Sequence, residues 1–188
     1  MILHRGQKAP YPVLANSTYQ DTVAFVDSGK YLQVDDCGNL ELDLTSSHGR
    51  FLMALDRVVK YPQQDETGSA VYYAFNSLAI IGQANVRWSL VFEPAMGRVH
   101  FRTSENPKIR WIELSRLDFS CNQDGAMLDL HADLHGDVSQ ALEPFSITRT
   151  LDHFRWFRSY WGTSPPPIFR ELLDVFTGFP CKEAVELP

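Results

Sequence analysis

The 188-residue sequence is poor in cysteine. Its three cysteines, Cys37, Cys121 and Cys181, lie far apart and form no CxxC pair. This spacing predicts neither a disulfide framework nor a cysteine-based zinc site. The sequence also lacks an excess of positive charge, because 17 Lys and Arg residues face 23 Asp and Glu residues, giving a net charge of −6. A protein that binds nucleic acid regardless of sequence needs a basic surface, so we expect no nucleic-acid partner.

Long apolar runs are absent as well. No stretch approaches the roughly 20 apolar residues that a membrane-spanning helix requires, so we expect no membrane partner. Residues 1–6 are too short and too polar for a signal peptide. Localisation stays open: cytoplasmic if the chain is complete, and periplasmic or secreted if it belongs to an exported precursor. A hydrophobic content of 44% is sufficient for a hydrophobic core. From the length of the sequence we expect a single domain over residues 1–188.

Three helices are predicted in the first half of the sequence. The first covers residues 19–26, with Ser17 or Thr18 as its cap. The second follows Ser46 or Ser47, carries apolar residues at helical spacing and ends before Pro62. The third covers residues 69–81. Each begins at a residue whose side-chain oxygen can accept a hydrogen bond from the first turn.

Strands are predicted next. Residues 86–92 and 99–102 alternate between apolar and other side chains on either side of a turn, which predicts a hairpin with one buried face. Further strands are predicted at residues 13–14, 109–114 and 127–134, and further helices at residues 147–160 and 168–176. Helices, then antiparallel strands, then helices indicate an α+β fold.

Asn16 follows a short extended segment, at a turn. An asparagine amide held by a rigid element can donate a hydrogen bond to the oxyanion of a tetrahedral intermediate. Alternatively, Asn16 adopts a turn conformation or caps the next helix.

Arg50 stands at the start of the second predicted helix, where the helix dipole disfavours a cation. This placement suggests a carboxylate partner such as a substrate group. The alternative is a surface arginine whose stem packs over Phe51.

A third candidate is the run containing His131, Asp133 and His135. If residues 127–134 form a strand that continues, these side chains share one face and could bind a divalent metal ion. The alternative is a solvated strand face of mixed charge.

Four segments resemble the choloylglycine hydrolase family of linear-amide C–N hydrolases, which includes bile salt hydrolases, penicillin V acylases and acid-ceramidase-like enzymes. Residues 9–19 resemble its "vlTNSPtY" segment and residues 46–51 its "SS-x-SRF" segment. Residues 87–103 resemble its hairpin, and residues 106–114 the strand that follows. The resemblance covers about residues 10–119.

This resemblance implies part of an αββα four-layer sandwich of the N-terminal-nucleophile hydrolase type, with antiparallel sheets and no cofactor. In such enzymes an N-terminal cysteine attacks the amide carbonyl and forms a thioester, while its own α-amino group serves as base. By the same resemblance, Asn16 contributes to the oxyanion hole and Arg50 lies in the active site.

In the family, the N-terminal cysteine lies far upstream of the segment that corresponds to residues 9–19. In this sequence only 15 residues precede Asn16. We therefore expect the C-terminal portion of the fold, inactive alone. Its partners would be a small-molecule amide substrate in the intact enzyme and either a complementary N-terminal segment or a second copy of the chain. The alternative is a non-catalytic binding or scaffold domain that retains the fold.

Overall fold

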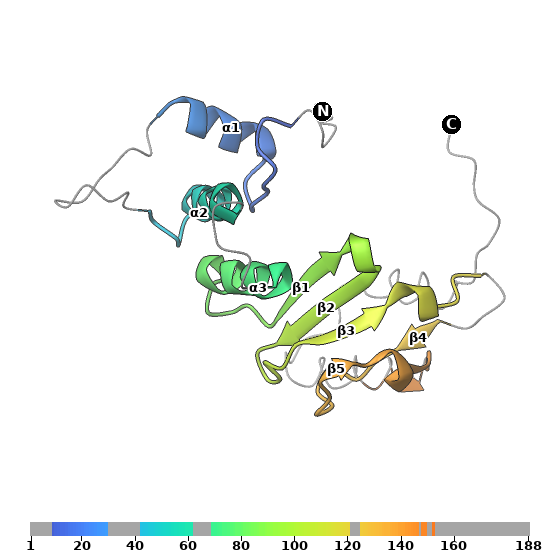
Figure 1. Ribbon diagram of the computed structural model, residues 1–188. Coiled ribbons are helices and arrows are strands. Elements are labelled where there is room, and N and C mark those ends of the chain that lie inside the picture. The colour runs from blue at the N-terminus through green and yellow to red at the C-terminus, as the bar shows by residue number, and fades with distance from the viewer. Residues whose placement is uncertain are drawn as a thin grey trace, which may run out of the picture. The chain divides into compact units, whose positions relative to one another are not determined.

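A computed structural model of the chain describes residues 9–29, 42–61, 69–120 and 125–146, together with residues 148, 149 and 152. The chain divides into two compact units, and Figure 1 labels their helices and most of their strands. The first comprises Met1–Glu93 and His100–Ser104, and the second comprises Pro94–Val99 and Glu105–Pro188. The single domain expected over residues 1–188 stays a prediction. Within the described ranges, none of the helices has the length and apolar character needed to cross a bilayer.

The first unit contains the three predicted helices, α1 (Tyr19–Asp27), α2 (Ser47–Lys60) and α3 (Ala70–Ile81). A hydroxyl side chain caps each one. Thr18 accepts a hydrogen bond from the Asp21 amide, Ser46 from the Gly49 amide and Ser69 from the Val71 amide. These caps satisfy backbone N–H groups that have no partner inside a helix, which is why the helices begin where the sequence predicts.

Phe51 forms the centre of the first unit's core and is only 1% exposed. Tyr11 and Tyr19 meet its ring edge to face, with centroid distances of 6.0 and 6.5 Å. Tyr11, in the segment before α1, and Tyr19, at the start of α1, therefore pack against Phe51 of α2. The edge-to-face arrangement is a favourable one for two aromatic rings.

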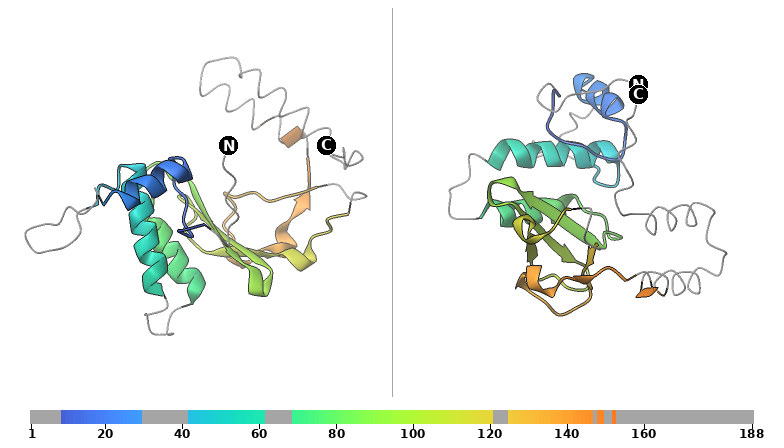
Figure 2. Two further views of the ribbon diagram at one scale, coloured as in Figure 1. Left: turned by 90° about the horizontal axis from the view of Figure 1, so that it is seen from above. Right: turned by 90° about the vertical axis from the view of Figure 1, so that its right-hand side faces the viewer.

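Helices α2 and α3 lie side by side (Figure 2). The Tyr73 hydroxyl donates to the Arg57 carbonyl oxygen at 2.6 Å, and Arg57 Nε donates to Ser77 Oγ at 3.1 Å. The Arg57 guanidinium also lies 4.4 Å from the centre of the Tyr73 ring. These contacts join the two helices that form one wall of the candidate site.

The predicted hairpin is formed by β1 (Trp88–Glu93) and β2 (Arg98–Thr103), joined by the 3-10 turn η3 (Pro94–Met96). The expectation that its apolar face is buried is wrong for β1. Its apolar side chains are exposed, by 60% for Trp88, 40% for Leu90 and 66% for Phe92. Strand β1 contacts α3. On the face of β1 opposite to these exposed residues, the side chains of Ser89, Val91 and Glu93 are half-buried.

In the second unit, β3 (Arg110–Glu113) pairs in parallel with β5 (Gly136–Asp137), with Arg110 opposite Gly136. This pair departs from the expected antiparallel pattern. The antiparallel pair β4 (Ala126–Met127) and β6 (Glu143–Pro144) forms a second, two-stranded sheet. The main sheet has the strand order β1-β2-β3-β5. Two 3-10 turns follow strands of this unit, η4 (Leu114–Arg116) after β3 and η5 (Ser139–Ala141) after β5.

The strand predicted at residues 127–134 is wrong beyond Met127, because residues 130 and 131 form a turn. The Asp129 carboxylate accepts a hydrogen bond from the His131 amide at 2.8 Å, an arrangement typical of turns. Residues 13–14 are not a strand either. The two helices predicted in the tail lie outside the described residues, apart from residues 148, 149 and 152, which are helical.

Candidate functional site

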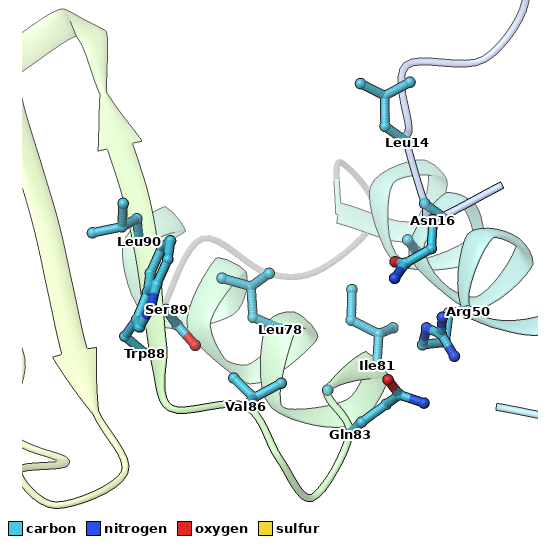
Figure 3. A pocket seen from close by; sticks show the side chains of 13 residues that line it. Leu14, Asn16, Arg50, Leu78, Ile81, Gln83, Val86, Trp88, Ser89 and Leu90 are labelled. Carbon is cyan, nitrogen blue, oxygen red and sulfur yellow. The ribbon is translucent and has the colours of Figure 1, made fainter. Parts of the chain in front are cut away.

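A pocket in the first unit brings Asn16 and Arg50 together (Figure 3). Its cavity volume is about 440 Å³, within the range of about 300–1,000 Å³ that is usual for small-molecule sites. Its apolar wall includes Leu78, Val86 and Trp88. The pocket therefore combines an apolar wall with a few polar side chains, as ligand sites commonly do.

Asn16 lies on the segment before α1, and its side chain is exposed at the pocket. Its carboxamide makes no hydrogen bond to any residue that the structure describes. Thr18, not Asn16, caps α1. No described residue other than glycine has a positive φ, so Asn16 does not occupy a left-handed turn position. The helix-cap alternative for Asn16 is therefore wrong, whereas the turn alternative agrees with the bend that the backbone makes at residues 16 and 17.

Two sets of hydrogen bonds position the Asn16 segment. The Tyr19 hydroxyl donates to the Tyr11 carbonyl oxygen at 2.7 Å and accepts from the Tyr11 amide at 2.8 Å. The Ser17 amide donates to Ser47 Oγ at 2.8 Å. Because Ser47 is the first residue of α2, this second bond ties the backbone next to Asn16 to the helix that carries Arg50.

Arg50 is half-buried in the first turn of α2. Its Nη1 donates to the carbonyl oxygens of Thr45 at 2.8 Å and Leu44 at 3.3 Å. These bonds fix one terminal nitrogen, while Nε and Nη2 bond to none of the residues that the structure describes. The guanidinium is thus oriented by backbone carbonyls and keeps donors for a ligand, which a carboxylate could accept.

The loop before α2 is held by Asp43. Its carboxylate accepts hydrogen bonds from the Thr45 hydroxyl at 2.5 Å and the Thr45 amide at 2.9 Å. These bonds, with a smaller contribution from the Arg50 charge, hold the pKa of Asp43 below its usual value. The loop also passes close to Gly49, where an added Cβ would lie 2.0 Å from the Asp43 carbonyl oxygen. The carbonyls that orient Arg50 therefore belong to a closely packed loop.

The described lining of the pocket carries one formal charge. Of the residues that the structure describes, 13 line the pocket, and Arg50 is the one charged side chain among them. A ligand that carries a single anionic group therefore meets a cation, whereas a cationic ligand meets no carboxylate on the lining.

The proposed metal ligands are not brought together. His131 Nδ1 lies 2.7 Å from a Glu105 carboxylate oxygen, and the Asp133 carboxylate lies 2.7 Å from Lys108 Nζ. Across the residues that the structure describes, no group of three or more His, Cys, Asp or Glu side chains is placed to hold a metal ion. The metal hypothesis at His131, Asp133 and His135 is wrong because the strand that would align them does not form.

Sequence reasoning missed two polar lining residues, Gln83 and Ser89. Gln83 lies in the turn between α3 and β1, and Ser89 lies on β1 (Figure 3). Neither belongs to a recognisable catalytic pattern. Cys37, Cys121 and Cys181 lie outside the described residues.

The polar residues of the fourth resembling segment have structural contacts. Arg110 is fully buried and donates to the Leu130 carbonyl oxygen at 2.9 Å. Burial lowers the pKa of its guanidinium. Asn106 donates to the carbonyl oxygens of Ala132 and Leu134, each at 3.1 Å. Both side chains hold the loop before β5.

Helices together with largely antiparallel strands define an α+β protein, and the comparison with solved structures finds this fold in a known acylase. One matching structure is that of penicillin V acylase from Agrobacterium tumefaciens, with a TM-score of 0.58 and 18% sequence identity. It covers 72% of this chain and 48% of the acylase chain, so the chain spans about half the length of that enzyme. At this identity the similarity establishes the fold alone. No protein-family model matches the sequence, and no curated protein matches it.

Proposed function

We propose that this chain supplies the oxyanion-binding and carboxylate-binding part of an enzyme that hydrolyses linear carboxamides. The observation that carries the proposal is the pocket where the unengaged carboxamide of Asn16 and the oriented guanidinium of Arg50 meet. The shared fold with an amide-hydrolysing acylase is consistent with this assignment.

In the proposed reaction a cysteine thiolate attacks the amide carbonyl carbon. The carbonyl oxygen becomes an oxyanion, and the C–N bond breaks as the amine leaves with the proton that the cysteine's α-amino group took from the thiol. Water then hydrolyses the thioester, which releases the acid and restores the thiol. Asn16 donates a hydrogen bond to that oxyanion, a contact whose loss costs about 3–4 kcal/mol in comparable sites. Arg50 binds a carboxylate of the substrate and so orients the scissile amide.

The nucleophile in this proposal is an N-terminal cysteine that lies outside these 188 residues. We therefore expect that incubating the chain with penicillin V or another acyl amide gives no turnover above background, as measured by chromatography of the released amine. Mass spectrometry of the same samples is the control. An acyl adduct on Cys37, Cys121 or Cys181 would contradict the proposal that this chain lacks the nucleophile.

The partner in this proposal is either a complementary N-terminal segment or a second copy of the chain. The exposed apolar side chains of β1 support an association of this kind. Monomeric soluble proteins rarely leave large contiguous apolar patches in water, and such patches commonly mark interaction sites.

A binding experiment tests the carboxylate part of the proposal. Penicillin V carries a carboxylate, and its methyl ester does not. We expect Arg50→Gln to weaken binding of the acid by roughly tenfold, as for a lost charge-assisted hydrogen bond, and to leave the ester unaffected. Equal effects on the two ligands would overturn the assignment and favour a scaffold domain without a substrate site.

A further inference from the structure

Gln83 and Ser89 are two further polar side chains at the pocket of Asn16 and Arg50, and Gln83 is the one on the same flank as these two residues. We infer that Gln83 is a specificity-determining residue: its carboxamide binds a neutral polar group of the substrate near the carboxylate held by Arg50. It thereby selects substrates with one negative charge over substrates with two. This inference rests on the proposed function.

The backbone at Gln83 is closely held. Gln83 follows Gly82, the residue that ends α3, and its carbonyl oxygen accepts a hydrogen bond from the Val86 amide at 3.0 Å. An added Cβ on Gly82 would lie 2.9 Å from the Leu78 carbonyl oxygen. The turn is therefore packed against the end of α3, and the Gln83 side chain starts from a defined position, as a residue that discriminates between ligands requires.

The Gln83 carboxamide is exposed and bonds to no residue that the structure describes. It offers two N–H donors and one carbonyl acceptor. In Figure 3, Gln83 lies with Asn16 and Arg50 on one flank of the pocket, whereas Trp88 and Leu90 lie on the other. Asn16, Arg50 and Gln83 thus form a polar flank, with Ile81 beside them, whereas β1 contributes the apolar Trp88 and Leu90 together with the hydroxyl of Ser89.

The charges of the lining decide what the polar flank can accept. Arg50 is the one charged residue among the 13 described residues that line the pocket, so it can neutralise one anionic group. A second carboxylate beside Gln83 would lose part of its hydration without gaining a cation, which is unfavourable. An amide or hydroxyl group at the same place can exchange hydrogen bonds with the Gln83 carboxamide without that cost.

A pair of nearly isosteric ligands tests the inference by isothermal titration calorimetry on the full chain. Phenylacetylglutamine carries an aromatic ring, an amide, one carboxylate and a neutral side-chain amide. Phenylacetylglutamate replaces that side-chain amide by a second carboxylate. We expect the wild type to bind phenylacetylglutamine about fivefold more tightly, the value of a typical net hydrogen bond.

Two variants sharpen the test. Gln83→Lys should reverse the preference in favour of phenylacetylglutamate, and Gln83→Leu should remove the preference for phenylacetylglutamine. Gln20→Lys is the matched control, because Gln20 is an exposed glutamine on α1 that does not line the pocket. It should leave the wild-type preference intact. Circular dichroism verifies the fold of each variant.

The Arg50→Gln variant distinguishes a failure of the inference about Gln83 from a failure of the proposed function. If Arg50→Gln weakens both ligands but the Gln83 variants leave their ratio unchanged, the inference about Gln83 is overturned while the proposed function stands. If Arg50→Gln changes neither affinity, or the wild type binds neither ligand, the proposed function itself is overturned.

Discussion

Among single residues, Ser47 connects the two parts of the candidate site. Its hydroxyl accepts the hydrogen bond from the Ser17 amide at 2.8 Å, next to Asn16, and it stands three residues before Arg50. The site therefore depends on a residue that does not itself line the pocket.

We predict that Ser47→Ala lowers the free energy of unfolding by about 1 kcal/mol, the value of one net hydrogen bond. We also predict weaker binding of penicillin V, because the Asn16 segment loses its link to α2. Ser69→Ala is the control, since it removes a helix cap of similar value from α3. Urea titration and calorimetry measure the two effects. Equal penicillin V affinity in both variants would show that Ser47 does not position the site.

The sequence could predict Asn16 and Arg50 as a pair because each stands in a segment that resembles a known family, and the pocket contains both. It could not predict Gln83. That residue reaches the pocket only because the turn after α3 closes tightly before β1, through the bond between the Val86 amide and the Gln83 carbonyl oxygen. Nothing in its local sequence marks that closure.

At the scale of helices and strands, local signals predicted most elements. The capping hydroxyls and apolar spacing located α1, α2 and α3 to within a residue or two of their ends. The strand expected at residues 127–134 failed for a tertiary reason. Buried Arg110 and Asn106 bind carbonyl oxygens of residues 130, 132 and 134, which a strand would use for pairing.

The end of β5 leads to a prediction about pH. The Asp137 carboxylate accepts hydrogen bonds from the Ser139 hydroxyl at 2.6 Å and the Ser139 amide at 2.9 Å, and Arg116 lies 3.4 Å away. These bonds, the hydroxyl bond first, hold the pKa of Asp137 below 3.8. Because the folded pKa is depressed, Asp137 stabilises the fold above about pH 3.8, and this contribution is lost as the pH falls through the folded pKa.

Carboxylate chemical shifts followed by NMR during an acid titration measure this pKa. We expect the Asp137 midpoint below 3.8 in the wild type and closer to 3.8 in Ser139→Ala. A wild-type midpoint at or above 3.8 would contradict the hydrogen bonds assigned to this carboxylate.

At the scale of the whole molecule, the exposed face of β1 predicts association. Phe92 is 66% exposed and does not line the pocket, so it can be changed without altering the candidate site. We predict that the wild type self-associates as its concentration rises and that Phe92→Lys weakens this association, because a charge on an apolar interface is costly to bury. Sedimentation velocity measures it.

Val59→Lys is the control for this experiment, since Val59 is 58% exposed on α2 rather than on β1. It should associate as the wild type does. A wild type that stays monomeric at every concentration, and that gains no partner when a complementary N-terminal segment is added, would contradict the proposed association.

The α+β class followed from the order of helices and strands, and the fold type followed from four resembling segments in the correct order. The α+β class agrees with the structural match to the acylase. The burial of the hairpin could not be predicted, because alternation along β1 identifies an apolar face without showing what covers it. In this chain β1 contacts α3, and the side chains of the opposite strand face are the half-buried ones.

The central claim is that Asn16 stabilises negative charge on a tetrahedral centre. Two monoanions test it directly: the methyl monoester of phenoxymethylphosphonate, which is tetrahedral, and phenoxyacetate, which is planar. Their affinities for the wild type, for Asn16→Ala and for the control Asn76→Ala, an exposed asparagine of α3, are measured by calorimetry. We predict that the wild type and Asn76→Ala prefer the phosphonate by roughly tenfold or more and that Asn16→Ala loses this preference. A preference that survives in Asn16→Ala, or that the wild type never shows, would contradict the claim.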